Sequence, residues 1–545
     1  MTQAVSNVLL FVASACPVAD VAARCAALLA EDESWHLLIV DDRADDAAAL
    51  HQDGSAFHHP RLTIVRRPRA IGQGSAHRLA LLHAMRFGYR ILVTLDGGTA
   101  FGVDQVRALL AAAGEADVVV GSRPPGGGGS AWVDDAVDWV GRKLVRATVD
   151  DCMSPFRVYR VDRLRGAGIE AIRSDGRVFH ARSLRAVLDR RLTVRNAAIP
   201  ADAPPASTFG STCRKIGSAL ADILRLPIGA FRRPHMPGLP PAEAERCPFC
   251  DSPYLVERWA ARRSGRPNAE AFRCTSMEHD NKPRVEQCLV CDLMFVPSWA
   301  RPQGLDALYG DVVDHAYLKY ADARRKTFSR LMDRLGPHLG KPGGALEIGS
   351  YCGLFLEAAR SRGWTTTGIE PSRWASGYAR DSLGLDVRTG MTEAVAPELG
   401  RDYDMVAMWD VLEHVSDPNQ ILAIANGKLR DGGILCLSTV DLSNWFPRIT
   451  GQNWPWLMDM HLYYFTPTTF ANYAAKAGFE IVHSETFSYY VSASYFAEKL
   501  SAVLPSAIGW LFDLLARLPL LARLYVLIAI GDSRLYVLRK RRAAN

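Results

Sequence analysis

Short apolar runs alternate with alanine-rich, amphipathic runs over the first part of the chain. This order is typical of a parallel sheet whose strands are joined by crossover helices. We therefore predict an α/β domain over residues 1–205. The runs expected to form its strands are Val8–Val12, His36–Val40, Leu62–Val65, Arg90–Leu95 and Val118–Val120.

The same alternation returns in the C-terminal half. An apolar run, Ala345–Ile348, leads into a glycine turn at Gly349 and Gly353 and then into a helical segment. A second strand follows and ends at Glu370, 21 positions after Gly349. Such a turn lets a ligand approach the backbone, and an acidic residue about 20 positions later can bind two ribose hydroxyls. The pattern predicts a second, Rossmann-like α/β domain that binds a nucleoside.

Changes in composition divide the rest of the chain. A proline-rich stretch separates the two α/β regions and is expected to be a linker. A cysteine module follows it, and a strongly apolar segment with basic residues at its end follows the second α/β region. We predict an α/β multidomain protein with a linker at 206–245, the cysteine module at 246–300, the second α/β domain at 301–491 and a helical tail at 492–545.

The bulk numbers agree with several packed domains. The chain has 545 residues, of which 48% are hydrophobic, so real cores are expected. A net charge of +6 is mild, and no dense Lys/Arg stripe with interleaved aromatics is present, so nucleic acid is not expected as a partner. The opening MTQAVSNVLLFVAS reads as a strand rather than a leader. An odd number of cysteines, 11, without a signal peptide favours the cytoplasm. No uncharged apolar run reaches 18 residues, so a membrane-spanning helix is not expected.

Four cysteines form a pair of CxxC motifs. Cys247 and Cys250 stand in the first, and Cys288 and Cys291 in the second. Each CxxC turn offers two thiolates to one ion, so two turns complete a tetrahedral zinc site. A closed four-cysteine site is structural, and we assign it no catalytic role. Cys274 and His279 lie between the motifs as spare or alternative ligands. An ordinary pair of disulfides or unrelated thiols is the competing interpretation.

Further motifs in the second α/β region sharpen its identity. The segments YDMVAMWDVLEHVSDP, LRDGGILCLST and HLYYFTPTTF follow the glycine turn in order. Residues 343–491 thereby resemble class I S-adenosylmethionine (SAM)-dependent methyltransferases. The resemblance implies SAM as cofactor. It places Glu347, Gly349, Gly353 and Glu370 around SAM, although Tyr351 stands where the family usually has another glycine.

The resemblance also indicates where chemistry would occur. In this family the end of the fourth strand lies beside the transferred methyl group, which implies that position for Asp410 and His414. A base is needed only if the acceptor must lose a proton, and histidine suits that task near neutral pH. His414 and His461 are the candidates; the alternative is that one caps a turn and the other packs in the core. Trp454, Trp456, Tyr463 and Tyr464 could line the acceptor, or be core aromatics.

The segment CDLMFVPSW followed by LYGDVVDHAYLKY gives a hint about the acceptor. It resembles the zinc-binding segment that precedes the catalytic domain in certain sugar C-methyltransferases. Relatives of those enzymes often act on nucleotide-linked sugars, polyketides or lipids. The resemblance therefore favours a sugar acceptor.

The N-terminal domain carries its own set of motifs. IVDDRADD, AIGQGSAHRLALLHAMRFGYRILVTLDGG, ADVVVGSR and DCMSPFRVYR resemble family 2 GT-A glycosyltransferases of the polyprenyl-phosphate mannose synthase type. The resemblance gives Asp41 and Asp42 to the nucleotide, Asp96 to a Mg²⁺ or Mn²⁺ ion on the diphosphate, and Arg123 and Arg157 to the acceptor phosphate.

This domain departs from the family at informative positions. The metal-binding DxD motif keeps only Asp96, because Gly97 and Gly98 follow it, although Asp134 and Asp135 could substitute. The usual DDGS turn has become DDRA. Three readings stay open: a working glycosyltransferase, a decayed domain that still binds a nucleotide sugar or lipid-linked sugar, and a purely structural domain.

The tail admits two readings. LSAVLPSAIGWLFDLLARLPLLARLYVLIAI is apolar but interrupted by charged residues and proline, and basic residues follow it. Such a segment can lie in a membrane interface, on the inner face of the membrane here, or pack as a helical hairpin on the second α/β domain.

Together these features predict a SAM-dependent methyltransferase that acts on a sugar or lipid-linked glycan and is fused to a glycosyltransferase-like domain. One alternative keeps the methyltransferase as the only enzyme, with the N-terminal domain as a recognition module for a nucleotide sugar or glycan. Another is a small-molecule O-methyltransferase of quinone or polyketide type.

Overall fold

The computed structural model contains two compact units. One unit comprises Met1–Arg258 with Gln287–Asp292, and the other comprises Trp259–Glu286 with Leu293–Asn545. The described residues are 8–14, 18–42, 59–96, 102–122, 149–164, 167–169, 172, 176, 178–199, 245–262, 270–275, 281–503 and 506–542. The glycine run Gly126–Gly129, Arg123, Asp134, Asp135, His279 and the proposed linker at 206–244 lie outside them.

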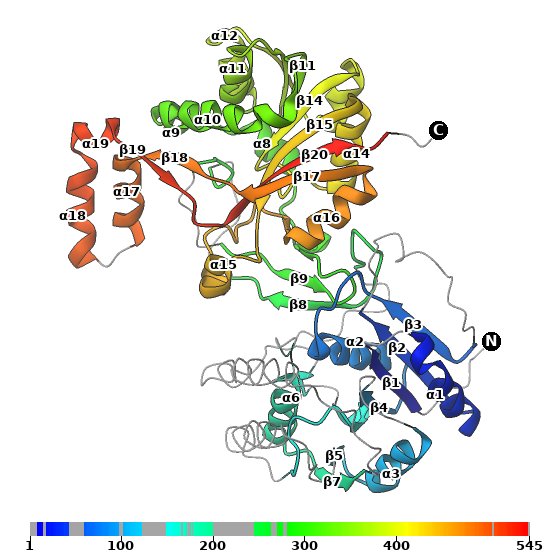
Figure 1. Ribbon diagram of the computed structural model, residues 1–545. Coiled ribbons are helices and arrows are strands. Elements are labelled where there is room, and N and C mark those ends of the chain that lie inside the picture. Colours follow the sequence, from blue (N-terminus) through cyan, green and yellow to red (C-terminus); the bar gives the residue numbers. More distant parts are fainter. Residues whose placement is uncertain are drawn as a thin grey trace, which may run out of the picture. The chain divides into compact units, whose positions relative to one another are not determined.

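The first unit is built on a seven-stranded mixed sheet with the order β3-β2-β1-β4-β6-β5-β7. Each run expected to form a strand does so, which confirms an α/β unit (Figure 1). β6 is antiparallel to both neighbours, and the other pairs are parallel. The strands are β1 Val8–Ser14, β2 Trp35–Asp41, β3 Leu62–Arg66, β4 Ile91–Asp96, β5 Val118–Ser122, β6 Arg157–Arg160 and β7 Val194–Ala198; the helices are α1 Val18–Glu31, α2 Gln73–Arg86, α3 Val103–Ala113, α5 Val161–Leu164 and α6 Val178–Asp189.

Apolar side chains of β1, β2 and β4 form the core of this unit. Leu10, Leu37 and Val93 are fully buried together with residues of α1 and α3. Parallel strands covered on both faces read as nearly continuous apolar runs, and that is why the sequence revealed them. The carboxyl ends of β2 and β4 carry the acidic residues discussed below.

The second unit contains another seven-stranded sheet, with the order β13-β12-β11-β14-β15-β20-β17. The strand order reverses beside β11, and in such sheets ligands bind at the carboxyl ends of the strands near the reversal. The strands are β11 Gly344–Ile348, β12 Thr365–Glu370, β13 Asp386–Thr389, β14 Tyr403–Trp409, β15 Leu429–Val440, β17 Phe479–Thr486 and β20 Ser533–Lys540. β10 Met294–Phe295 and β16 Tyr463–Tyr464 pair antiparallel. β8 Leu255–Trp259 and β9 Val285–Cys288 precede them in the chain.

Helices cover the second sheet on both faces (Figure 1). α10 and α11 pack together over β11, where Leu331 and Phe355 belong to one buried cluster. α14 and α16 pack together on the other side. The helices are α8 Leu305–Gly310, α9 His315–Lys319, α10 Ala321–Leu339, α11 Leu354–Arg360, α12 Arg373–Asp381, α13 Thr392–Val395, α14 Pro418–Lys428, α15 Trp445–Thr450 and α16 Pro467–Lys476.

The tail differs from the expected helical segment. Residues 533–540 form β20, which pairs antiparallel with both β15 and β17 inside the sheet, so the helical assignment is wrong there. The reason is burial: Leu535, Val537 and Leu538 are almost fully buried between neighbouring strands. The preceding residues form β18 Tyr489–Ser492, α17 Ala493–Val503, α18 Ser506–Ala516, α19 Pro519–Arg523 and β19 Tyr525–Ile528. In the described part, no helix has the length and apolar character needed to cross a membrane.

Candidate functional site

The glycine turn after β11 follows the predicted pattern. Gly349 and Gly353 have φ angles of 73° and 77°, the left-handed region that favours glycine. A Cβ at Gly349 would lie 2.6 Å from Val411 Cγ2, and one at Gly353 would lie 2.6 Å from Leu385 Cδ1. Both positions therefore need glycine for conformation and for space. The turn is fixed to the second strand because Gly349 N donates to the carbonyl of Ile369 at 2.8 Å.

Glu370 stands at the end of β12, facing this turn. Its carboxylate accepts the backbone N–H of Tyr351 at 2.8 Å and that of Ser372 at 2.8 Å. The side chain is 4% exposed, and burial raises its pKa to about 7 although both N–H groups oppose that shift. Each carboxylate oxygen has two lone pairs, so each can still accept a ribose hydroxyl.

Tyr351 replaces the usual glycine without breaking the turn. It adopts a positive φ of 45°, a strained conformation for a side chain of this size. Its hydroxyl donates to Asp314 Oδ2 at 3.2 Å, and its ring contacts that of Tyr317 edge-on with centroids 4.5 Å apart. Asp314 also caps α9 by accepting from Tyr317 N. The segment before α10 thus holds Tyr351 in place, and strain of this kind is common at ligand-binding sites.

Glu347 lies at the end of the first strand, beside Glu370. It is 2% exposed, and burial, followed by the neighbouring Glu370 charge, raises its pKa well above the ordinary value. Its Oε2 has no hydrogen-bond partner among the described residues. A buried acceptor without a donor is costly, and the ammonium group of a methionine moiety would satisfy it. The glycine turn and these two carboxylates therefore fit SAM.

Asp410 begins the loop after β14. It has a positive φ of 52° and is exposed, and its Oδ1 accepts the hydroxyl of Ser438 at 2.8 Å. The surrounding protein raises its pKa, and the nearby Asp532 carboxylate adds to the shift. Asp532 is buried and accepts the indole N–H of Trp456. Sequence reasoning missed Asp532 as a site residue, although the GD pair before β20 was a signal for it.

The structure brings both candidate histidines together. The rings of His414 and His461 meet edge-on with centroids 4.6 Å apart. His414 Nδ1 lies 3.0 Å from the carbonyl of Met460, which can only accept, so Nδ1 carries the proton and Nε2 carries the lone pair. Burial lowers the pKa of His414 to about 4, so the ring is neutral near pH 7.

Glu413 joins this pair and was missed by sequence reasoning. It is 1% exposed, and its Oε2 accepts the hydroxyl of Thr439 at 2.9 Å. Burial, followed by the charge of Asp410, raises its pKa to about 8. One potential ligand atom from each of Glu413, His414 and His461 lies within 4.8 Å of the others.

Tyr309 connects the histidines with the SAM-side carboxylates. Its hydroxyl lies 3.1 Å from His414 Nδ1. Burial raises the pKa of this phenol well above the ordinary value, and the charges of Cys274, Glu413 and Glu370 contribute in that order. Tyr309 and Tyr351, whose backbone N–H donates to Glu370, pack against the same buried apolar cluster.

The candidate acceptor aromatics divide into two groups. Trp454, Tyr463 and Tyr464 are almost fully buried, as expected for core residues. Trp456 is only half-buried, and its ring stacks near that of His461 with centroids 6.4 Å apart. Of the four, Trp456 has the position and exposure to line an acceptor site.

The four cysteines of the CxxC pair come together in the first unit. Their sulfur atoms lie within 4.8 Å of one another, with Cys247 Sγ 3.5 Å from Cys291 Sγ. The two turns have the same backbone design: Asp251 N donates to Cys247 O, and Asp292 N donates to Cys288 O. Both aspartates have positive φ angles, 56° and 66°. Two matched turns that aim four sulfurs at one point fit a tetrahedral zinc ion.

Two of the sugar-nucleotide candidates of the first unit, Asp42 and Arg157, have protein partners. Asp42 forms a two-pronged ion pair with Arg67, whose side chain is fully buried. Arg157 is also fully buried and donates to the carbonyls of Ser154 and Cys152. Asp41 is 7% exposed at the end of β2, and Asp96 ends β4. The roles of these residues, and of Arg123 outside the described residues, stay predictions.

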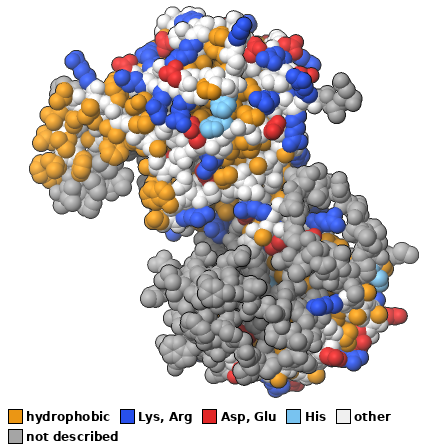
Figure 2. Space-filling model, in the orientation of Figure 1, with side chains coloured by type: hydrophobic (Ala, Val, Ile, Leu, Met, Phe, Trp, Pro, Cys, Tyr) orange, Lys and Arg blue, Asp and Glu red, His pale blue; other side chains and the backbone are white. Residues whose placement is uncertain are grey.

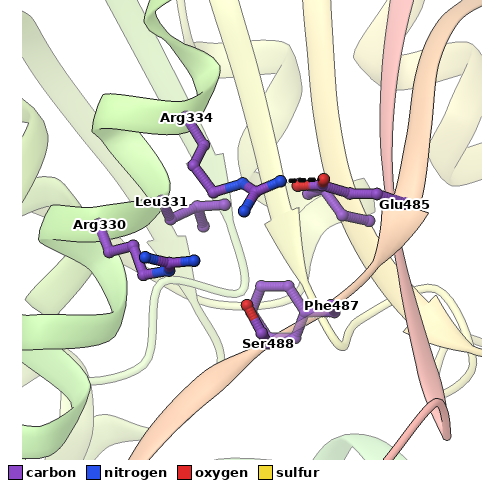
Figure 3. Close-up of a pocket in the computed structure, with 7 residues that line it drawn as sticks. Arg330, Leu331, Arg334, Glu485, Phe487 and Ser488 are labelled. Carbon is purple, nitrogen blue, oxygen red and sulfur yellow. Dashed lines mark hydrogen bonds and ion pairs between the residues drawn. The ribbon is translucent and has the colours of Figure 1, made fainter. Parts of the chain in front are cut away.

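Figure 3 shows a small pocket between α10 and β17. An ion pair of Arg334 with Glu485 closes one side of it. Phe487 forms another wall and stacks near Trp409 with centroids 6.4 Å apart. None of the predicted site residues lines this pocket, so it is not the candidate site.

Comparison with known proteins supports both halves of this description. Residues 320–484 match the family model described as "Methyltransferase domain", so the C-terminal region contains a methyltransferase domain. A ubiquinone biosynthesis O-methyltransferase of Pseudomonas aeruginosa is 31% identical over 18% of this chain and 44% of its own length. A SAM-dependent methyltransferase of Thermotoga maritima, described as a possible histamine N-methyltransferase, aligns over 42% of this chain and 94% of its own length, with a TM-score of 0.28 and 19% identity.

The N-terminal region has different relatives. The undecaprenyl-phosphate mannosyltransferase of Micrococcus luteus is 31% identical over 26% of this chain. The chain spans 60% of the length of that relative and 44% of the ubiquinone methyltransferase. The N-terminal region is therefore similar to this mannosyltransferase over part of its length.

Proposed function

We propose that this protein transfers the methyl group of SAM to a sugar or lipid-linked glycan intermediate. The observation that carries the proposal is Glu370, a buried strand-end carboxylate that braces the glycine turn through Tyr351 N and keeps lone pairs for a ribose. Gly349 and Gly353 give the ligand access to the backbone. Glu347 supplies an acceptor for the methionine ammonium group.

Methyl transfer needs mainly alignment, because the methyl carbon of SAM is already activated. Holding both reactants in line can itself lower the barrier substantially. Asp410, at the exposed end of β14, is positioned to orient the acceptor. His414 presents the lone pair of Nε2 and can receive a hydroxyl proton, and His461 supports its ring from the side.

The acceptor follows from the combination of relatives. A region homologous to an undecaprenyl-phosphate mannosyltransferase in the same chain favours a sugar or a lipid-linked glycan. The likeness to a ubiquinone biosynthesis O-methyltransferase favours the small-molecule alternative. Transfer of labelled methyl from SAM to nucleotide sugars, polyprenyl-phosphate sugars and quinols, tested side by side, separates these acceptors. Labelling of quinols alone would contradict the glycan proposal.

For the first unit we propose either sugar transfer or recognition of a nucleotide sugar or lipid-linked sugar. The pairing of Asp42 with Arg67 and the enclosure of Arg157 argue against sugar transfer, because both residues already have protein partners. Titration of the full chain with UDP- and GDP-sugars, with and without Mn²⁺ or Mg²⁺, tests this. Binding that requires the cation and is lost in Asp96→Ala would indicate a working transferase instead.

We propose that the four cysteines hold one structural zinc ion. Native mass spectrometry of the full chain should find zinc held by these cysteines, and Cys250→Ser together with Cys288→Ser should lower the zinc content by one ion per chain. A fully folded chain without zinc would contradict this assignment.

We propose that α17–α19 bind a membrane surface from the cytoplasmic side. Large apolar side chains are exposed there, among them Trp510 at 62% and Leu520 at 78%, and Figure 2 shows hydrophobic side chains crowded on this segment. Exposed apolar surface of this extent on a helix commonly marks an interaction site. Co-sedimentation with anionic vesicles should fall when Leu514 and Leu520 are changed to Ser. Unchanged sedimentation would rule the segment out.

A further inference from the structure

His414 and His461 form a cluster with a third side chain, the carboxylate of Glu413. Glu413 and His414 are neighbours in the loop after β14, and His461 precedes β16. The carbonyl of Glu413 accepts the N–H groups of Leu462 and Tyr463, at 2.7 Å and 3.1 Å. These two hydrogen bonds join the two segments and bring the side chains of Glu413, His414 and His461 close together. One ligand atom of each lies within 4.8 Å of the others.

We propose that Glu413, His414 and His461 bind a first-row divalent cation in the Mn²⁺ to Zn²⁺ series. Two imidazoles and one carboxylate form a ligand set that leaves positions of the ion open for other ligands. The proposal of a bound cation stands alone, but its catalytic use rests on the proposed methyltransferase function.

The groups around the three residues support ligation. A metal-binding histidine normally donates its other ring N–H to a carbonyl or carboxylate, which fixes the tautomer. His414 does this through Nδ1 and the Met460 carbonyl, so Nε2 is the ligand atom. Glu413 is fixed as an acceptor, because its Oε2 accepts the hydroxyl of Thr439. Glu413 and His461 are 1% and 5% exposed, and a buried carboxylate next to two rings is best satisfied by a cation.

The cation would bind the methyl acceptor through a hydroxyl group. Because His414 Nε2 then ligates the cation, the bound hydroxyl loses its proton to solvent rather than to His414, and the cation stabilises the alkoxide. The alkoxide oxygen forms a bond to the methyl carbon of SAM, the carbon–sulfur bond breaks, and the sulfonium becomes a neutral thioether. Sugars with two neighbouring hydroxyls can chelate such an ion, so the site selects acceptors of that kind.

Binding of Mn²⁺ to the full chain tests the proposal, measured by electron paramagnetic resonance. Mn²⁺ suits oxygen and nitrogen ligands and disfavours the four-cysteine cluster. We expect one Mn²⁺ per chain, with binding weakened at least about tenfold in Glu413→Gln and in His461→Ala. His483→Ala, a surface histidine on β17, serves as the matched control and should bind as the unchanged protein does.

Two further readings make the result decisive. Spin-echo modulation from imidazole nitrogen should be present on Mn²⁺ bound to the unchanged protein, a signal that does not depend on a variant folding. Absence of bound Mn²⁺, absence of nitrogen modulation, or Mn²⁺ lost in Asp96→Ala but kept in His461→Ala would overturn the proposal. SAM affinity measured on the same samples is independent: its absence would contradict the proposed function and leave the metal result standing.

Discussion

The two α/β units place an acidic residue at the end of their second strand, and they use it differently. In the second unit Glu370 accepts only backbone N–H groups and faces a glycine turn. In the first unit Asp42 follows β2 and is held by the buried guanidinium of Arg67. Strand-end carboxylates therefore do not report binding by position alone. Whether such a carboxylate can bind a ligand depends on whether a cationic side chain of the protein already pairs with it.

The largest expected effect concerns Asp42, the carboxylate that is paired with Arg67. Arg67→Met should destabilise the first unit by about 3–5 kcal/mol, because breaking a buried ion pair leaves an uncompensated charge. Hydrogen exchange of the amides in β2 and β3 gives the local stability. Adding Asp42→Asn should recover part of the loss. If Asp42→Asn instead weakens nucleotide-sugar binding without changing stability, the contrast between the units disappears.

The next effect concerns Glu370, the carboxylate that accepts only backbone N–H groups. Glu370→Ala should weaken SAM binding by about 100-fold or more, since a hydrogen bond to a charged group contributes about 1.5–3 kcal/mol and the ribose offers two hydroxyls. Calorimetry on the full chain measures this. Glu357→Ala, which removes a carboxylate of α11 paired with Arg325, is the control and should leave affinity unchanged. Equal affinities would remove Glu370 from the site.

A comparison of two glycines sharpens the argument about space. Gly353 and Gly384 both have positive φ angles, but a Cβ meets Leu385 Cδ1 at 2.6 Å only at Gly353. Replacement by alanine should cost about 1 kcal/mol at Gly384 from the backbone alone and about 2–4 kcal/mol at Gly353, where overpacking adds to it. Urea unfolding measures both. Similar losses would mean that the turn can relax.

The smallest expected effect is the pH dependence of SAM affinity. Burial raises the pKa of Glu370 to about 7 from 4.5, so the protonated form is favoured in the folded protein. Its contribution to stability is present at low pH and is lost as pH rises through 7. The ribose requires the ionised form, so affinity should fall by up to about tenfold per pH unit below 7. Glu370→Gln should flatten this profile.

The sequence could predict what depends on neighbours along the chain. The apolar strands, the turn at Gly349 and Gly353, and Glu370 belong to one continuous pattern, and each lies where that pattern put it. The sequence did not reveal Glu413 and Asp532 as site residues, because their partners come from distant segments. Glu413 is bound by Thr439, and Asp532 by Trp456. The pairing of Asp42 with Arg67 joins two strand ends, so no local periodicity announces it.

The strand β20 has a consequence for how the second unit forms. Because Ser533–Lys540 lies between β15 and β17, these two strands have no shared neighbour until that segment has been synthesised. Domains generally fold as units while the chain is made, and pairings between distant segments form slowly. During synthesis, the edges of β15 and β17 therefore stay unpaired until Ser533–Lys540 has been made. In the first unit, all seven strands of the sheet have been made by residue 198.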